Sequence, residues 1–243
     1  AGARLVGVPV SPDDGWDLDR AAQTFARVLP ALAYLMPEFQ NPTGRTMGDA
    51  EVAAFVDGAQ RAGTYLVLDE TTAGLDIDRP TAPVAFPDLG RILRVGSLGK
   101  TVWGGLRVGW VRAESDIIRR LASGRSVHDL GTPEFEQAVA AKVLHRLDEI
   151  SAQRADLLRD GRDALTRALT EHFPEWEIPT VHGGVSLWVG LGEPVSTPLV
   201  MSARARGLLL SAGSRFAVEG GHDRRLRIPF RSEEHTSELQ SHF

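Results

Sequence analysis

The chain has 243 residues, of which 42% are hydrophobic and 24% charged, with a formal net charge of −5 and no cysteine. This composition is ordinary for a globular protein, and the length suffices for one large core or two modest domains. The lack of cysteine excludes disulfides and thiolate metal sites, and it fits a reducing, cytoplasmic location. The acidic balance predicts no nucleic-acid surface in this segment, and no apolar run is long enough to span a membrane. The histidines lack ligand spacing, so no metal site is predicted.

Apolar runs alternate with segments of helical periodicity in the first part of the chain. This alternation predicts strand–helix–strand units, a largely parallel sheet and the α/β fold class. The expected strands are Leu5–Val10, Leu32–Met36, Leu66–Leu68, Ile92–Val95 and Val108–Val111, with a helix over Leu18–Leu29. Thr46, followed by Asp49, resembles a capping box and predicts the start of a second helix, which ends at Gly63.

A long helical stretch is expected from Pro133 to Phe173–Pro174, with an interruption near Gly161. Apolar residues recur within it at helical spacing and predict packing in the core. These residues are Phe135, Val139, Val143, Leu144 and Leu147.

The pattern changes after Pro174, where short apolar runs surround one helical segment near Pro198–Arg206. The strands expected there are Trp176–Ile178, Val185–Val189, Leu208–Leu210 and Leu226–Ile228. This pattern predicts a smaller α+β unit. We therefore expect 1–148 to be part of a larger domain and 149–230 to form a smaller one.

Both ends of the chain look artificial at the sequence level. The start reads as entry into a strand without an initiator methionine, and 231–243 looks like the translation of a common DNA-sequencing adapter. That segment has no hydrophobic period and follows an abrupt change of composition after Phe230, so it is excluded from fold reasoning. We expect the chain to be a gene fragment.

Lys100 is the most informative residue, because it follows a short apolar strand within a glycine-rich loop, seven residues before Arg107. An amine that is partly desolvated near other cations is favoured in its neutral, nucleophilic form. A loop lysine by itself is more often solvated. Two other segments change that interpretation: Asn41-Pro-Thr-Gly follows one apolar run, and Asp69 ends another.

The order of these motifs resembles the pyridoxal-phosphate enzymes of the class I/II aminotransferase family, from Ala1 to about Phe230. The motifs are a strand with Asn-Pro-Thr-Gly, a strand with Asp, and a strand with Ser-x-x-Lys and Arg. The resemblance implies a fold-type I protein, with a three-layer large domain around a mainly parallel sheet and a smaller C-terminal α+β domain. It also implies pyridoxal 5′-phosphate as cofactor, an amino acid and a 2-oxo acid as substrates, and a homodimer.

The resemblance assigns a role to each motif residue. Lys100 would form a Schiff base with the cofactor and then act as general base and acid in the proton shift. Asp69 would keep the pyridine nitrogen protonated, and Asn41 would donate to the phenolic oxygen of the ring. Ser97 and Arg107 would hold the phosphate, the latter as a bidentate fork.

Arg227 matches the family position that binds the substrate α-carboxylate, although Arg224 and Arg225 are competing neighbours. The chain departs from the family pattern after the aspartate, where Thr71 and Thr72 stand in place of a tyrosine carried by many relatives. Thr72 is therefore a candidate cofactor contact, with a shorter hydroxyl that is a much weaker acid.

Two alternative functions remain open. The segments 67–71 and 104–110 are similar to GntR/MocR-type transcription regulators, in which an aminotransferase-like domain senses the cofactor or an amino compound. The run 66–76 also resembles a Walker B strand, and Gly99-Lys100-Thr101 echoes the P-loop of an NTPase. The first P-loop position is Arg94 instead of glycine, and the lysine follows the aspartate strand instead of preceding it.

Overall fold

The computed structural model describes residues 2–88, 90–125, 127, 129 and 131–230. The expected adapter segment, 231–243, lies outside the described residues. A short antiparallel pair, β1 (Val10–Ser11) and β2 (Gly15–Trp16), precedes helix α1 (Leu18–Val28).

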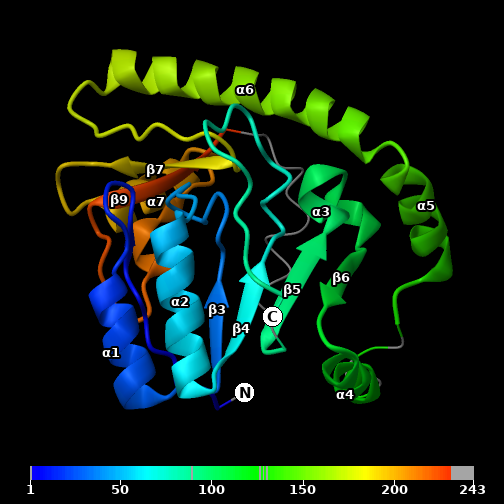
Figure 1. Cartoon of the computed structure of the whole chain (residues 1–243). Coiled ribbons are helices and arrows are strands. Elements are labelled where there is room, and N and C mark those ends of the chain that lie inside the picture. Colours follow the sequence, from blue (N-terminus) through cyan, green and yellow to red (C-terminus); the bar gives the residue numbers. More distant parts are fainter. Residues whose placement is uncertain (1, 89, 126, 128, 130, 231–243) are drawn as a thin grey trace.

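The main sheet has the order β3 (Leu32–Leu35), β4 (Tyr65–Asp69), β5 (Ile92–Ser97) and β6 (Gly109–Arg112). Strands β3, β4 and β5 are parallel, whereas β6 runs antiparallel to β5. The register pairs Leu35 with Leu68 and Asp69 with Val95. The carboxyl ends of the parallel strands therefore lie at one edge of the sheet (Figure 1).

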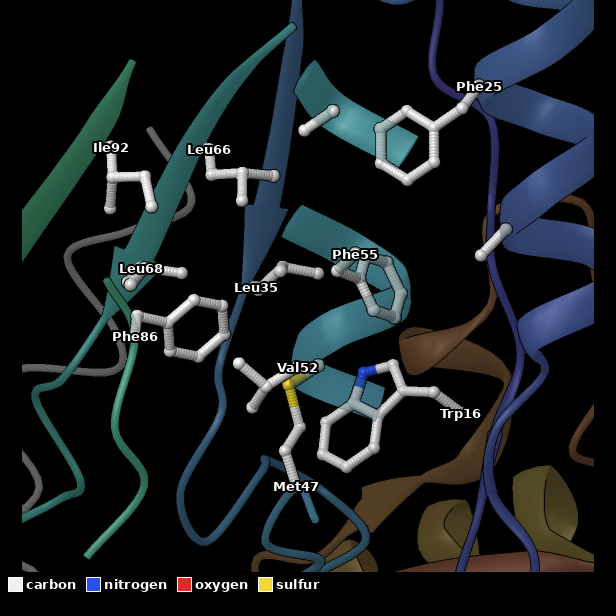
Figure 2. Packing of buried hydrophobic residues seen from close by; sticks show 12 residues of the cluster. Trp16, Phe25, Leu35, Met47, Val52, Phe55, Leu66, Leu68, Phe86 and Ile92 are labelled. Carbon is white, nitrogen blue, oxygen red and sulfur yellow. The ribbon is translucent and has the colours of Figure 1, made fainter. Parts of the chain in front are cut away.

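Helix α1 and helix α2 (Asp49–Ala62) cover one face of this sheet (Figure 1). Leu66 and Leu68 point into that core, as the period-2 alternation of a strand requires. Phe55 of α2 is 1% exposed and meets the ring of Phe25 edge to face, with centroids 6.0 Å apart (Figure 2). Gly58 permits this contact, because a Cβ there would clash with the Phe25 ring.

The second half of the chain adds helices and a small antiparallel sheet of order β7-β9-β8. Its strands are β7 (Ser186–Gly190), β8 (Ser211–Ala212) and β9 (Arg225–Pro229). The remaining helices of the chain, including two 3-10 turns, are α3 (Leu98–Thr101), η1 (Gly104–Leu106), α4 (Ser115–Arg125), α5 (Glu134–Leu144), α6 (Leu147–His172), α7 (Ser196–Ala205) and η2 (Gly213–Phe216). Helix α6 runs along the top of the molecule in Figure 1 and packs Leu158 and Leu169 into the core of the small sheet.

The predicted α/β class with a mostly parallel main sheet is confirmed. The domain boundary near residue 148 stays a prediction. In the part of the chain that the structure describes, no helix is long and apolar enough to cross a membrane.

Several predicted strands are wrong in extent. The expected strand Leu5–Val10 is reduced to β1, which starts only at Val10, because Pro9 lacks an N–H for a ladder. The expected strand Trp176–Ile178 is a single bridge between Glu177 and Gly190. The expected strand Leu208–Leu210 lies before the strand that forms, β8.

The helix boundaries also differ from the predictions. Helix α2 begins at Asp49, and the capping contact comes from Glu51, whose carboxylate accepts the Gly48 N–H at 2.7 Å. Thr46 lies in the preceding loop, where its hydroxyl accepts the Phe39 N–H at 3.3 Å. Helix α4 was not predicted at all.

Gly161 does not interrupt α6, which is continuous from Leu147 to His172. A Cβ at Gly161 would clash with the carbonyl of Phe230. The glycine therefore serves a close approach between the helix and the end of β9, and the helix break lies instead between α5 and α6.

The predicted burial of this stretch is wrong for two of its five residues, since Phe135 is 76% exposed and Leu144 is 50% exposed. Val143 is partly buried, and Val139 and Leu147 pack beside a small cluster around Ala140. Within the described chain, α5 packs mainly through Val139 and Ala140. The other apolar residues of its predicted core face, Phe135 and Leu144, are exposed to solvent.

The aromatic pair between α1 and α2 gives the first testable prediction. Phe55→Ala should lower the free energy of unfolding by about 3–5 kcal/mol, because it leaves a cavity in a closed core. The matched control, Phe135→Ala, should change it by less than about 0.5 kcal/mol because that ring is exposed. Urea unfolding measures both values, and equal losses in the two variants would contradict the described packing.

Candidate active site

The site lies at the carboxyl edge of the main sheet, where the motif residues follow neighbouring parallel strands. Asn41 is in the loop after β3, Asp69 ends β4, and Ser97 ends β5 just before Lys100 in α3. Arg107 returns to this edge immediately before β6, because the Leu98 N–H donates to the Val108 carbonyl at 3.1 Å. The fold thus brings these five predicted residues to one edge of the sheet.

The carboxylate of Asp69 accepts two hydrogen bonds from its own chain. The Thr71 N–H donates to Oδ1 at 2.9 Å, and the Tyr34 hydroxyl donates to Oδ2. Partial burial, together with this hydrogen bond and the charge of Asp69, raises the pKa of Tyr34 above its usual range. Tyr34 was missed at the sequence level, although its place in β3 could have indicated it.

Lys100 is presented by a four-residue helix, α3, whose first turn is capped by Ser97. The Ser97 hydroxyl accepts the Gly99 N–H at 3.0 Å and donates to the Val108 carbonyl at 3.3 Å. From α6, Arg154 Nη2 donates to the Lys100 carbonyl at 2.9 Å. Main-chain contacts on both sides therefore fix the lysine turn.

Two of the predicted cofactor-binding residues have side-chain polar atoms without a hydrogen-bond partner in the described chain. Asn41 Oδ1 is buried and has no hydrogen-bond partner among the described residues. The exposed Arg107, which lies in the left-handed region at φ 52°, makes no side-chain hydrogen bond or ion pair within the same part of the chain. A buried amide oxygen without a partner is uncommon, and such a group is typical of a ligand site.

Thr72 occupies a different place from the one expected of it. Its side chain is 2% exposed, and its hydroxyl donates to the Glu38 carbonyl at 2.7 Å. Thr72 therefore joins the loop after β4 to the loop after β3, and its hydroxyl has no second proton to donate to a bound group.

A buried ion pair reinforces the same junction. Arg79 pairs with the carboxylates of Glu38 and Asp76 and donates to the Ala73 carbonyl at 2.9 Å. Its guanidinium also lies 4.8 Å from the centroid of the Phe39 ring. Sequence reasoning missed this cluster, because its members are far apart along the chain and share no recognisable spacing.

Arg227 lies in β9, the middle strand of the small sheet, and is 3% exposed. Its competitors have partners near the surface: Arg225 pairs with Glu177 at 3.0 Å, and Arg224 donates to the Gly192 carbonyl. Of the three arginines, Arg227 alone is buried. Trp188, which is opposite it on β7, is 2% exposed and belongs to the core.

Arginines of α6 also hold the loops between the two sheets. Arg159 Nη2 donates to the Ile77 carbonyl at 2.7 Å, and Arg162 Nη1 donates to the Val181 carbonyl at 2.9 Å. Arg162 further pairs with Asp78, and this hydrogen bond lowers the pKa of Asp78 to about 2 against an opposing effect of burial. His182 Nδ1, 3.0 Å from the same carboxylate, contributes to this lowering.

Comparison with known proteins identifies the family. Residues 4–243 match the model for aminotransferase class I and II. The chain belongs to this family. Its members depend on pyridoxal phosphate, and this membership leaves the P-loop interpretation without support.

The curated relatives include both enzymes and regulators. Aromatic-amino-acid aminotransferase 1 of Thermococcus litoralis is 30% identical over 207 residues, covering 82% of this chain and 49% of the relative. The uncharacterized HTH-type transcriptional regulator YdfD of Bacillus subtilis is 30% identical over 241 residues, covering 96% of this chain and 49% of the relative. The chain thus spans about half the length of these relatives.

Solved structures support the fold. The multiple substrate aminotransferase of Thermococcus profundus has a TM-score of 0.82 at 28% identity, covering 93% of this chain and 58% of that one. LysN, the α-aminoadipate aminotransferase of Thermus thermophilus, has a TM-score of 0.85 at 24% identity, covering 94% and 61%. The fold-type I architecture implied by the motifs is confirmed.

The Asp78–Arg162 pair predicts a pH dependence of stability. The pKa of Asp78 falls from 3.8 to about 2 on folding, so its contribution is complete above about pH 4 and is lost as the pH falls toward 2. The free energy of unfolding should therefore drop more steeply between pH 4 and pH 2 in the wild type than in Asp78→Asn. Urea unfolding across this range measures the difference.

Asp163→Asn is the matched control, because it removes the other carboxylate beside Arg162 and leaves Asp78 in place. If the free energy of unfolding falls equally steeply between pH 4 and pH 2 in the wild type and in Asp78→Asn, the stabilising role of the Asp78–Arg162 pair is wrong.

Proposed function

We propose that the chain is the core of a pyridoxal-phosphate-dependent transaminase, which exchanges an amino group between an amino acid and a 2-oxo acid. One observation carries this proposal: the main sheet brings an amine, a carboxylate and an amide to one edge through its parallel strands, and a guanidinium through the return to β6. A homodimer in the cytoplasm is the form expected from the family resemblance.

The residues at this edge fit the cofactor by charge and by hydrogen-bonding capacity. Asp69 is an anion suited to a protonated ring nitrogen, and Arg107 is a cation suited to the phosphate. The amide nitrogen of Asn41 can donate to the phenolic oxygen of the ring, and its buried Oδ1, which has no partner in the described chain, remains free to accept from a bound group. The Ser97 hydroxyl, which already caps α3, would add a phosphate contact.

When bound, the cofactor supplies an electron sink next to the amino group of the substrate. Lys100 would hold the cofactor through its Nζ atom and then move a proton from the α carbon of the substrate. Arg227, buried in the small sheet, would orient the α-carboxylate with its two-pronged guanidinium.

A second candidate is an effector domain that senses the cofactor or an amino compound within a transcription regulator. The similarity to YdfD over 96% of this chain favours it, since that relative is as identical as the aminotransferase relative. The threonines at 71 and 72 are compatible with a site that binds without rapid turnover, and a DNA-binding segment would lie elsewhere in the protein.

Turnover distinguishes the two candidates. The protein with bound pyridoxal phosphate is mixed with an excess of amino acids and 2-oxo acids, and the new amino acid is quantified per site. A transaminase should produce many equivalents per site, whereas a sensor should bind the amino compound and produce at most one.

Asp69→Ala tests the assignment at the ring nitrogen. The variant should still attach the cofactor, but the exchange of the substrate α-proton with solvent should slow by orders of magnitude, because the ring loses its anionic partner. NMR of the α position in heavy water measures the rate. Asp57→Ala, on the exposed side of α2, is the control and should behave like the wild type. Normal exchange in Asp69→Ala would show that the assignment is wrong.

A further inference from the structure

Tyr34 stands on β3 with its side chain on the face of the sheet opposite to α1 and α2. Leu35, the next residue, is buried in the core of that covered face, whereas Tyr34 is 56% exposed. The register pairs Tyr34 with Val67, so Asp69 lies two residues further along the neighbouring strand on the same face. A long side chain can reach such a diagonal neighbour.

The contact that results is specific. The Tyr34 hydroxyl donates to Asp69 Oδ2, while the main chain of Thr71 donates to Oδ1. Each carboxylate oxygen thus has one donor from the chain and keeps lone pairs for a further partner. A phenol of ordinary pKa already keeps its proton at neutral pH, and the pKa of Tyr34 is raised further, so the hydroxyl is the donor.

We infer that Tyr34 is a positioning residue for Asp69, which fixes the carboxylate plane and keeps the shared proton on the cofactor's ring nitrogen instead of on the carboxylate. This inference rests on the proposed function. A carboxylate that already accepts hydrogen bonds is favoured in its charged form, so it binds an additional proton less readily. Removing the Tyr34 donor therefore shifts the proton toward Asp69 and weakens the electron sink.

The other tyrosine of the chain provides a matched control. Tyr65 begins β4, at the opposite edge of the sheet from the candidate site, and its ring lies 4.8 Å from the guanidinium carbon of Arg91. Tyr34→Phe and Tyr65→Phe each remove one phenolic oxygen, but only the first removes a donor to Asp69.

The test has two readouts besides activity. Without cofactor, the carboxyl ¹³C resonance of Asp69 should move in Tyr34→Phe and stay in Tyr65→Phe. With ¹⁵N-labelled pyridoxal phosphate, the ring-nitrogen resonance should move toward that of an unprotonated pyridine in Tyr34→Phe alone. The α-proton exchange rate should fall about tenfold, as expected for one hydrogen bond to a charged group, with KM changed less than twofold.

The outcomes separate the two claims. If the wild type does not attach the cofactor at Lys100, the proposed function fails, and the ¹³C readout alone then tests the Tyr34–Asp69 contact. If the wild type attaches it but the Tyr34→Phe resonances match those of the wild type, the positioning role is wrong and the proposed function stands. Equal melting temperatures of Tyr34→Phe and Tyr65→Phe exclude a general loss of structure as the cause.

Discussion

The parallel register of β3, β4 and β5 is the constraint on which the site depends. Residues that follow these strands meet at one edge only because neighbouring strands run the same way, with Leu35 beside Leu68 and Asp69 beside Val95. The ladder is held by a buried face on which Leu68 is 0% exposed, so the strands cannot slip without exposing that core. The positions of Asn41, Asp69 and Lys100 at this edge therefore depend on the packing of the buried face of the sheet.

Strand ends alone would leave their loops free, and buried or partly buried arginines remove that freedom. Arg79 joins the loop after β3 to the loop after β4, while Arg154 of α6 binds the Lys100 carbonyl. Charge-assisted hydrogen bonds are stronger than neutral ones, which makes arginine effective for this purpose. A buried ion pair adds little net stability unless its hydrogen bonds are satisfied, and the acceptors around Arg79 meet that condition. The loops are thus held in position before any ligand arrives.

Sequence patterns predicted the main strands and the residues at their ends, because hydrophobic periodicity and strand order are local properties. They failed where a remote contact decides the outcome. Gly161 looked like a helix break, yet it accommodates the Phe230 carbonyl. Phe135 had the periodicity of a core residue, but periodicity does not say what covers a helix face. Thr72 was expected at the cofactor, and Tyr34 was overlooked, because both depend on which loop or strand lies alongside.

Covalent labelling tests the central claim most directly. The protein is incubated with pyridoxal phosphate, reduced with borohydride and digested, and the modified peptide is located by mass spectrometry. The chain contains only two lysines, so Lys142, on the exposed side of α5, is an internal control. The account predicts a phosphopyridoxyl group on Lys100 at one equivalent per chain, with Lys142 unmodified. A folded protein labelled equally at both lysines, or at neither, would contradict it.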